Sequence, residues 1–424
     1  MNKKNVVSIA AGVSSLMFSL SAFAGDKDVI VVTEAEEPAS AFSTFIKDTR
    51  PFVDGRLRFE WADIGGFDDG SVLSLRNRFG IETGKLAGFS FLVEGEHTWI
   101  MTDPDNYNAY PGVPSKRSII ADPENLVLNR LQLAFDGFDS HVVAGRQRIT
   151  IDDHRFIGNV GWRQNEQTFD AALFQNQSIE DLKLTYGYID RVNRIFGEYA
   201  PSEGLTRFES NSHLFHVEYA GLGIGKIRAF SYLLDLGDDS GLAKKWSTNT
   251  YGIELQGSQD ISDSGLSYKY LLTAAWQEDA GANPVNYGTG YYRAEFGLKK
   301  KSVNGGIGAE FLTSDGGKAA FQTPLATGHK FNGFADAFLI TPDTGLRDYY
   351  AWVGATCPLK IKHKLILHYF TSDQGSDRLG FETDYVAVKK INDHFSVLLK
   401  LAFLNGSGSQ ADISRASLQM DYSF

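Results

Sequence analysis

The chain alternates hydrophobic and polar residues in many short runs, and the last run is the clearest. From Ala416 to Phe424 the hydrophobic residues share one parity, and from Arg415 to Ser423 the polar residues share the other. A β-strand points successive side chains to opposite faces, so this segment has a hydrophobic face and a hydrated face. It ends in aromatic residues, which membrane interfaces favour. The pattern predicts the closing strand of a β-barrel with lipid outside and water inside.

About eighteen such runs follow one another, each near the ~9–11 residues of a tilted membrane crossing. An even number of strands suits a bacterial outer-membrane barrel. The predicted strands cover 56–61, 73–82, 89–96, 125–136, 141–151, 169–177, 181–190, 211–220, 226–234, 248–258, 266–276, 290–300, 304–313, 346–357, 361–370, 380–390, 395–404 and 412–424.

The connections between these runs alternate in length. Short ones include 83–88, 137–140 and 392–394, whereas long ones include 100–124 and 314–345. Short periplasmic turns and long extracellular loops are the usual asymmetry of outer-membrane barrels. A soluble β-sandwich would also alternate along its strands, but it would not show this loop pattern. The fold class predicted is an all-β transmembrane antiparallel barrel.

The N-terminus carries the pattern of a secretory signal. Lys3 and Lys4 precede a hydrophobic stretch and a small-residue cleavage motif, so we expect a signal peptide over 1–24 with cleavage near Ala24. A short periplasmic segment over 25–51 and one barrel domain over 52–424 should follow. These features predict a protein of the bacterial outer membrane.

Composition and charge refine this picture. The chain carries a formal net charge of −11, and loss of the signal peptide's two lysines makes the mature chain more acidic still. Its one cysteine, Cys357, excludes an internal disulfide, and the histidines are scattered. We therefore expect no structural metal site, no cofactor and no nucleic-acid partner.

Arginine is concentrated on the polar parity of the early strands. A charge facing lipid at mid-membrane would cost ~2–4 kcal/mol, so these side chains should face the lumen. Guanidinium groups bind carboxylates through paired hydrogen bonds, and an arginine-lined lumen favours anions. Alternatively, the arginines pair with lumen acids such as Glu60, Glu82, Glu94 and Glu96 and brace the wall. The arginines are Arg56, Arg58, Arg76, Arg78, Arg130, Arg146 and Arg148.

Acidic residues gather in the loops, for example at Asp103 and Asp105 or at Asp152 and Asp153. Such loops bind Ca²⁺ in some proteins, because hard cations prefer carboxylate oxygens, and bound Ca²⁺ would help bridge lipopolysaccharide. The plainer interpretation is that they are solvated.

Two segments interrupt the strand rhythm and carry a family resemblance. One runs from Gly145-Arg146-Gln147-Arg148-Ile149 through 152–158 to Gly161-Trp162-Arg163-Gln164-Asn165. The other runs from Gly328-His329-Lys330-Phe331-Asn332-Gly333 through 334–342 to Gly345-Leu346-Arg347-Asp348. With the barrel pattern, they resemble the alginate-export family of outer-membrane porins. The resemblance implies a monomeric eighteen-stranded barrel, an electropositive passage narrowed by loops, and passive diffusion of an anionic polysaccharide without catalysis.

The resemblance also implies site residues. Arg155 and Arg163 would join Arg146 and Arg148 on the solute path, and constriction-loop candidates would be His329, Lys330, Asp336 and Arg347. The acidic mature chain and the fewer arginines of the later strands fit uptake of acidic oligosaccharides, or general nutrient diffusion, as well as polymer export.

Two other functions fit parts of the sequence. An adhesin or anchor would display the long loops around a closed lumen. A barrel phospholipase would place a histidine two residues before a serine on one strand face, as His394 and Ser396 stand here. The passive pore, with outer-membrane lipid and an anionic saccharide as its partners, is the function that we predict.

Overall fold

The computed structural model describes residues 41–238, 241, 243–261 and 265–424. The predicted signal peptide over 1–24, and residues 25–40 of the predicted periplasmic segment, lie outside the described residues. Within that segment, the helix α1 (Ala41–Asp48) precedes the first strand, which begins at Arg50.

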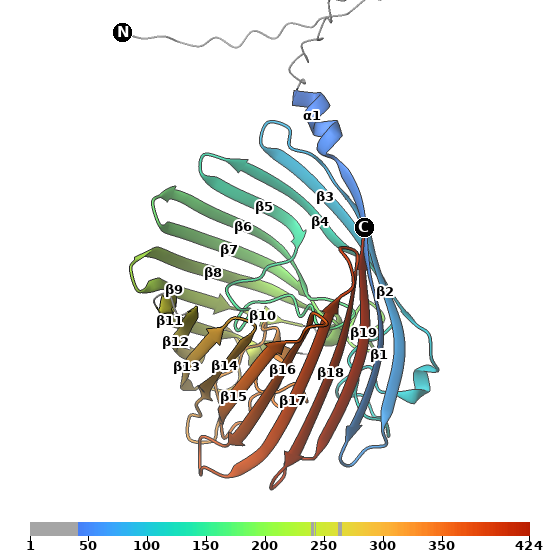
Figure 1. Ribbon diagram of the computed structural model, residues 1–424, viewed down its shortest axis with the longest axis vertical. Coiled ribbons are helices and arrows are strands. Elements are labelled where there is room, and N and C mark those ends of the chain that lie inside the picture. The colour runs from blue at the N-terminus through green and yellow to red at the C-terminus, as the bar shows by residue number, and fades with distance from the viewer. Residues whose placement is uncertain (1–40, 239–240, 242, 262–264) are drawn as a thin grey trace, which may run out of the picture. The chain divides into compact units, whose positions relative to one another are not determined.

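The described residues form one antiparallel sheet that closes on itself (Figure 1). The two residues of β10 continue β9 beyond an interruption at Asp235, and β9 and β10 each pair with β8. Because β9 and β10 together make one crossing, the wall has eighteen crossing strands. The strands are β1 (Arg50–Ile64), β2 (Gly70–Glu82), β3 (Phe89–Ile100), β4 (Asn125–Gly137), β5 (Ser140–Gln147), β6 (Thr168–Ile179), β7 (Leu182–Asn193), β8 (Arg207–Leu222), β9 (Gly225–Leu234), β10 (Leu236–Gly237), β11 (Thr248–Ile261), β12 (Leu266–Asp279), β13 (Gly288–Lys300), β14 (Val303–Leu312), β15 (Leu346–Thr356), β16 (Ile361–Thr371), β17 (Arg378–Lys390), β18 (Phe395–Gly406) and β19 (Ile413–Ser423). A short helix, α2 (Glu203–Thr206), and the 3₁₀ turns Pro104–Asn106, Ala243–Trp246 and Gly328–Lys330 lie in the connections.

The first and last strands close the barrel. β1 and β19 pair along their length, with Leu57 opposite Met420, and lie side by side in Figure 1. The backbones of Val53 and Phe424 then exchange two hydrogen bonds of 2.8 and 3.1 Å. Closure leaves no unpaired sheet edge, which a lipid environment requires. The predicted fold class and the predicted closing strand are confirmed.

The two faces of the wall carry opposite chemistry. On β19, Leu418 is 54% exposed on the outside, whereas its neighbours Ser417 and Gln419 are buried inside. Arg58 on β1 is fully buried and Phe59 beside it is exposed. A hydrophobic exterior and a charged interior are therefore built from alternate residues, as predicted. In the part of the chain that the structure describes, no helix has the length and hydrophobicity needed to cross a bilayer.

The connections alternate as predicted. One end of the barrel has short turns, such as 138–139, 180–181 and 357–360, and the other end carries long connections, among them 101–124, 148–167 and 313–345. Two of the long connections contribute to the main hydrophobic core, which buries Ile149, Ile157 and Phe321. They are also tied together, because the Gly158 N–H donates to the Leu325 carbonyl at 2.8 Å.

The fifth strand is shorter than predicted. β5 ends at Gln147, not at residue 151, so Arg148 stands in the following connection. Gly145 precedes this end with a positive φ of 114°, and a Cβ there would lie 2.2 Å from the Leu131 carbonyl oxygen. Glycine thus permits the close approach of the two strands just before the chain leaves the sheet.

The assignment of faces can be tested by placing one arginine on the wall. Leu418→Arg puts a charge on the outward face at the middle of β19, so we expect it to lower the free energy of unfolding in lipid vesicles by ~2–4 kcal/mol. Phe138→Arg, in an exposed short turn, is the control and should change it little. Equal losses in denaturant titrations of the two variants would contradict the assignment.

Candidate functional site

Two cavities in the lumen are formed by residues that the structure describes. The larger, of about 620 Å³, we call the chamber; it reaches toward the short-turn end and is lined by Arg228, Lys269, Arg293, Lys330, Trp352 and Lys364, among others. The smaller, of about 280 Å³, we call the vestibule; it lies among the long connections and is lined by Ile119, Phe196, Trp246, Pro324, Leu339 and Ile340, among others. Residues 328–336 line both cavities, and we call this segment, together with residues 160–164, the plug.

The plug is centred on the indole of Trp162. Its ring stacks on the His329 imidazole, with centroids 4.5 Å apart and planes 6° from parallel. Two cations from the wall lie over the same indole, Arg58 at 4.0 Å and the Lys400 ammonium at 3.5 Å. Cation–π contacts between desolvated groups are worth about 2 kcal/mol each. The wall therefore holds the plug through aromatic and cationic contacts.

His329 also takes part in a buried polar chain. Its Nδ1 lies 2.7 Å from Asp336, and its Nε2 lies 2.8 Å from the Lys400 Nζ. Asp336 in turn accepts a hydrogen bond from Arg163 at 2.6 Å. Burial, aided by the nearby Lys400 charge, lowers the pKa of His329 to about 3, so the ring is neutral at physiological pH. His329, Asp336 and Arg163, three predicted site residues, are thus brought together.

Two β1 arginines fasten the plug to the wall. Arg56 donates to the carbonyl oxygens of Gly161, Trp162 and Arg163 at 2.9 to 3.2 Å. Arg58 donates to the Trp162 carbonyl at 2.5 Å and to Asp122 at 3.2 Å. Both point inward as predicted, and both are used to hold the loop.

The arginines of β2 to β4 pair with carboxylates on adjacent strands of the wall. Arg76 contacts Asp54 at 2.7 Å, and Arg78 contacts Glu96 at 2.6 Å. The guanidinium of Arg130 binds both oxygens of Glu94, at 3.0 and 2.5 Å. Each charge is therefore largely neutralised, as the bracing alternative predicts.

Arg148, in the connection after β5, bridges two acids. It lies 2.9 Å from Glu94 and 2.5 Å from Glu166. Glu166 also lies 3.4 Å from Arg78, and these two guanidinium groups lower the pKa of Glu166 to about 2 despite its burial. Glu166 was missed in the sequence, because a lone acid in a long loop gives no sign of its partners.

Arg155 lies in the same connection as Arg148, residues 148–167, but has different partners. It contacts Glu310 of β14 at 2.5 Å and Asn332 of the plug at 3.1 Å. The Phe331 ring lies 4.8 Å from the same guanidinium. Arg155 therefore joins two long connections to the far wall.

Two predicted site residues point away from the lumen. Arg146 pairs in register with Leu131, which is 41% exposed on the outer face, and forms an ion pair with Asp170 at 2.7 Å. Arg347 lies opposite Phe311 on β14 and pairs with Asp373 at 2.9 Å. Both stand close to strand ends at the long-loop rim, where an outward charge can be hydrated and paired. Arg146 was predicted on the solute path and Arg347 in the constriction loop, and the outward placement corrects both predictions.

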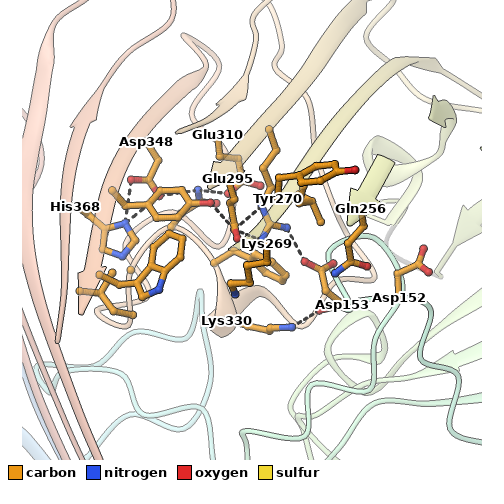
Figure 2. Close-up of a pocket in the computed structure, with 18 of the residues that line it drawn as sticks. Asp152, Asp153, Gln256, Lys269, Tyr270, Glu295, Glu310, Lys330, Asp348 and His368 are labelled. Atoms are coloured by element: carbon orange, nitrogen blue, oxygen red, sulfur yellow. Dashed lines mark hydrogen bonds and ion pairs between the residues drawn. The ribbon is translucent and has the colours of Figure 1, made fainter. Parts of the chain in front are cut away.

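The chamber brings together charges that the sequence did not single out. Arg293 contacts Asp153 at 2.6 Å and Glu295 at 2.5 Å, and Arg228 contacts Asp152 at 2.9 Å. Figure 2 shows Asp153, Glu295 and Lys330 around the same space. Most arginines here are thus matched by acids, as they are in the wall of β1 to β4.

The lysines of the chamber are different. Lys269 and Lys364 lie over the Trp352 ring, with Nζ 5.4 and 5.8 Å from its centroid. Among the described residues, neither ammonium has a carboxylate oxygen within 4 Å. Lys330, predicted as a constriction residue, donates to the Asp153 carbonyl at 2.7 Å, and burial together with the charges of Arg293 and Lys269 lowers its pKa. Over the described residues, these lysines are therefore chamber cations that form no ion pair with a carboxylate within 4 Å.

The residues of the alternative hydrolase site make structural contacts. His394 Nδ1 lies 2.7 Å from the Ser423 carbonyl oxygen, and its ring stacks on Phe424 at 4.8 Å, so the His394–Ser396 pair does not form a nucleophile and its base. Within the described ranges, no group of three or more His, Cys, Asp or Glu is arranged to hold a metal ion. The calcium site stays a prediction.

Comparisons with known proteins extend these observations. No family model matches the chain, and no curated protein matches its sequence. Solved structures of similar fold include Pseudomonas aeruginosa OccK9 (OpdG), with 14% identity, and Acinetobacter baumannii OccAB2, with 13% identity. Each alignment has a TM-score of 0.67 and covers 90% of this chain and 99% of the other. Pseudomonas aeruginosa OpdK, solved with vanillate, is 13% identical with the same TM-score and coverage.

This likeness establishes the fold, which is that of outer-membrane channels. A closed barrel with a hydrophobic exterior and a charged interior is the architecture of the bacterial outer membrane. The chain is therefore an outer-membrane β-barrel, with short turns toward the periplasm and long connections toward the exterior.

Acid should weaken the plug through His329. A histidine whose folded pKa lies below its unfolded value stabilises the structure above pH ~6.5 and loses that contribution as pH falls toward about 3. We expect hydrogen exchange, corrected for its intrinsic pH dependence, to show weaker protection of residues 328–336 at pH 4.5 than at pH 7, by at most ~1.4 kcal/mol per pH unit. His329→Gln should remove most of this difference; an unchanged difference would contradict the assignment.

Substitutions at Arg148 and Arg146 test which of the two side chains faces the lumen and which faces the outside of the barrel. Arg148→Gln leaves Glu94 and Glu166 less neutralised in the lumen, so we expect the anion-to-cation permeability ratio to fall about two- to fivefold, the effect of up to ~1 kcal/mol. Arg146→Gln removes the same charge from the outer face and should leave the ratio unchanged. Reversal potentials in a salt gradient provide the measurement, and equal effects would contradict the placement.

Proposed function

We propose that the protein is a passive channel that selects small anionic solutes at the chamber. The observation that carries this proposal is the set of chamber lysines, Lys269, Lys330 and Lys364. They present ammonium groups to a cavity whose arginines are already engaged with acids. A mobile carboxylate can therefore pair with a lysine without displacing a buried ion pair.

The environment of these lysines favours brief binding. An ammonium is a compact, strongly hydrated charge on a flexible stem, whereas guanidinium binds carboxylates through two fixed hydrogen bonds. Trp352 supplies a flat apolar surface beside Lys269 and Lys364. Conduction needs sites that attract a solute but release it again, and weak lysine contacts meet that condition.

The size of the chamber supports a small solute. A volume of about 620 Å³ lies within the ~300–1,000 Å³ of pockets that hold drug-sized ligands. The solved neighbour OpdK contains vanillate, a single-ring carboxylate. By analogy, a ring-sized carboxylate is the solute that we propose for this chain.

Alginate-like uronates are the finer alternative that the sequence resemblance suggests. A single uronate unit belongs to the proposed solute class, because it carries one carboxylate on one ring. An extended polyuronate would need a continuous row of available cations. Arg78, Arg130, Arg155 and Arg163 are instead bound to acids. We therefore favour single-ring anions over the polymer.

The chamber lysines can be tested with a double variant. Lys269→Gln/Lys364→Gln removes two unpaired cations, so we expect the anion-to-cation permeability ratio in planar bilayers to fall about five- to twentyfold, at up to ~1 kcal/mol for each charge. Lys318→Gln/Lys390→Gln removes two exposed lysines that pair with Asp315 and Asp393, and is the matched control. An unchanged ratio in the chamber variant would contradict the proposal, and absence of current steps in the wild type would favour the anchor alternative.

A further inference from the structure

We propose that the vestibule is a separate capture subsite, which binds the hydrophobic body of an anionic solute before it reaches the plug. The inference rests on the proposed channel function and adds to it a solute class: monoanions that carry an apolar ring. It is carried by the apolar walls of the vestibule, by the cation Arg194 within them, and by the engagement of the other polar groups, Arg163 and Arg415 included, with the protein itself.

The walls combine apolar side chains from several long connections. Ile119 comes from 101–124, Phe196 from 194–206 and Trp246 from 238–247, while Leu339 and Ile340 come from 313–345. Leu339 is 53% and Ile340 59% exposed, although the adjacent Phe338 is almost fully buried. Exposed apolar area costs about 25 cal/mol per Å². A ligand that covers these two side chains would recover part of that cost.

A cation stands within this apolar wall. The guanidinium of Arg194 lies 5.1 Å from the Phe196 ring and 4.4 Å from the Phe208 ring, and it donates to the Gly204 carbonyl at 2.5 Å. In the described part of the chain, no carboxylate oxygen lies within the 4 Å of an ion pair with it, and the charge that acts on it from farther away is that of Asp238. Burial lowers the pKa of Arg194 to about 10, so it remains charged at neutral pH. An apolar wall with a cation embedded in it suits a ring that bears one negative group.

The polar groups of the vestibule are mostly committed to the protein. The Gln322 amide donates to the Thr341 carbonyl and accepts from the Thr341 N–H, and the Gln167 amide donates to the Gly158 and Leu325 carbonyls. Arg415 donates to the Ala335 and Ile119 carbonyls. A sugar would bury hydroxyl groups here without partners, at about 1–3 kcal/mol each. This argues for an apolar ring over a carbohydrate.

The volume of the vestibule agrees with a solute that carries a single ring. At about 280 Å³, the vestibule falls just below the ~300–1,000 Å³ of sites for drug-sized ligands. It has room for one ring-sized solute and not for an oligosaccharide. Because Arg163, His329 and Asp336 of the plug form its floor, a solute held there already lies against the barrier to the chamber.

The test compares two permanently ionised probes, benzenesulfonate and methanesulfonate, added to single channels from the long-loop side. Both carry one negative charge, so they differ in the apolar ring. For the wild type we expect benzenesulfonate to interrupt the current several times more often than methanesulfonate at equal concentration. Leu339→Ser/Ile340→Ser should lower the benzenesulfonate frequency at least threefold and leave the methanesulfonate frequency and the open-channel current unchanged.

The control variant is Leu359→Ser/Ile391→Ser, which alters two exposed apolar residues in short turns at the opposite end; it should match the wild type. Equal frequencies for the two probes in the wild type, or no effect of the vestibule substitutions, would overturn the inference while leaving the channel intact. A wild type that carries no current, or no anion preference, would instead refute the proposed function on which the inference rests.

Discussion

The lumen depends on one constraint: each arginine buried in the barrel wall must be paired, because an uncompensated charge in a partly dehydrated interior is costly. The wall meets this constraint with carboxylates on neighbouring strands, as for Arg78 and Glu96. The long connections meet it with their own acids and carbonyls, as when Glu166 takes up Arg148. The same contacts that neutralise the wall therefore draw two connections inward and hold them as a plug.

In the proposed channel, this pairing changes which residues would set selectivity. An arginine bound to two acids, such as Arg163 with Glu60 and Asp336, contributes little free positive charge to a passing solute. Lys269 and Lys364 rest against an indole and keep their charge available. The acidic net charge of the chain is then compatible with an anion-selective path, because selectivity follows the unpaired charges that line the cavity and not the total.

Much of the fold followed from the sequence, because strand parity is a local property: Leu418 and Gln419 differ in chemistry, and the two sides of the wall differ in the same way. The inward arginines of β1 to β4 were found for that reason. Arg146 was misplaced because Val142 and Val143 put apolar residues on both parities before it, so that the pattern did not fix its face. Arg347 was predicted as a constriction-loop residue from the family resemblance alone. It lies on the outer face, where an ion pair with Asp373 neutralises its charge.

The plug and the chamber could not be read in the same way, since their contacts join residues far apart in the chain, such as Trp162 with Lys400. Anion selection in this lumen requires that the cations left unpaired there act on passing ions. The reversal potential of the wild-type channel in a potassium chloride gradient tests this most directly. A potential displaced toward the chloride equilibrium value is the predicted result; one at zero, or displaced toward potassium, would contradict it.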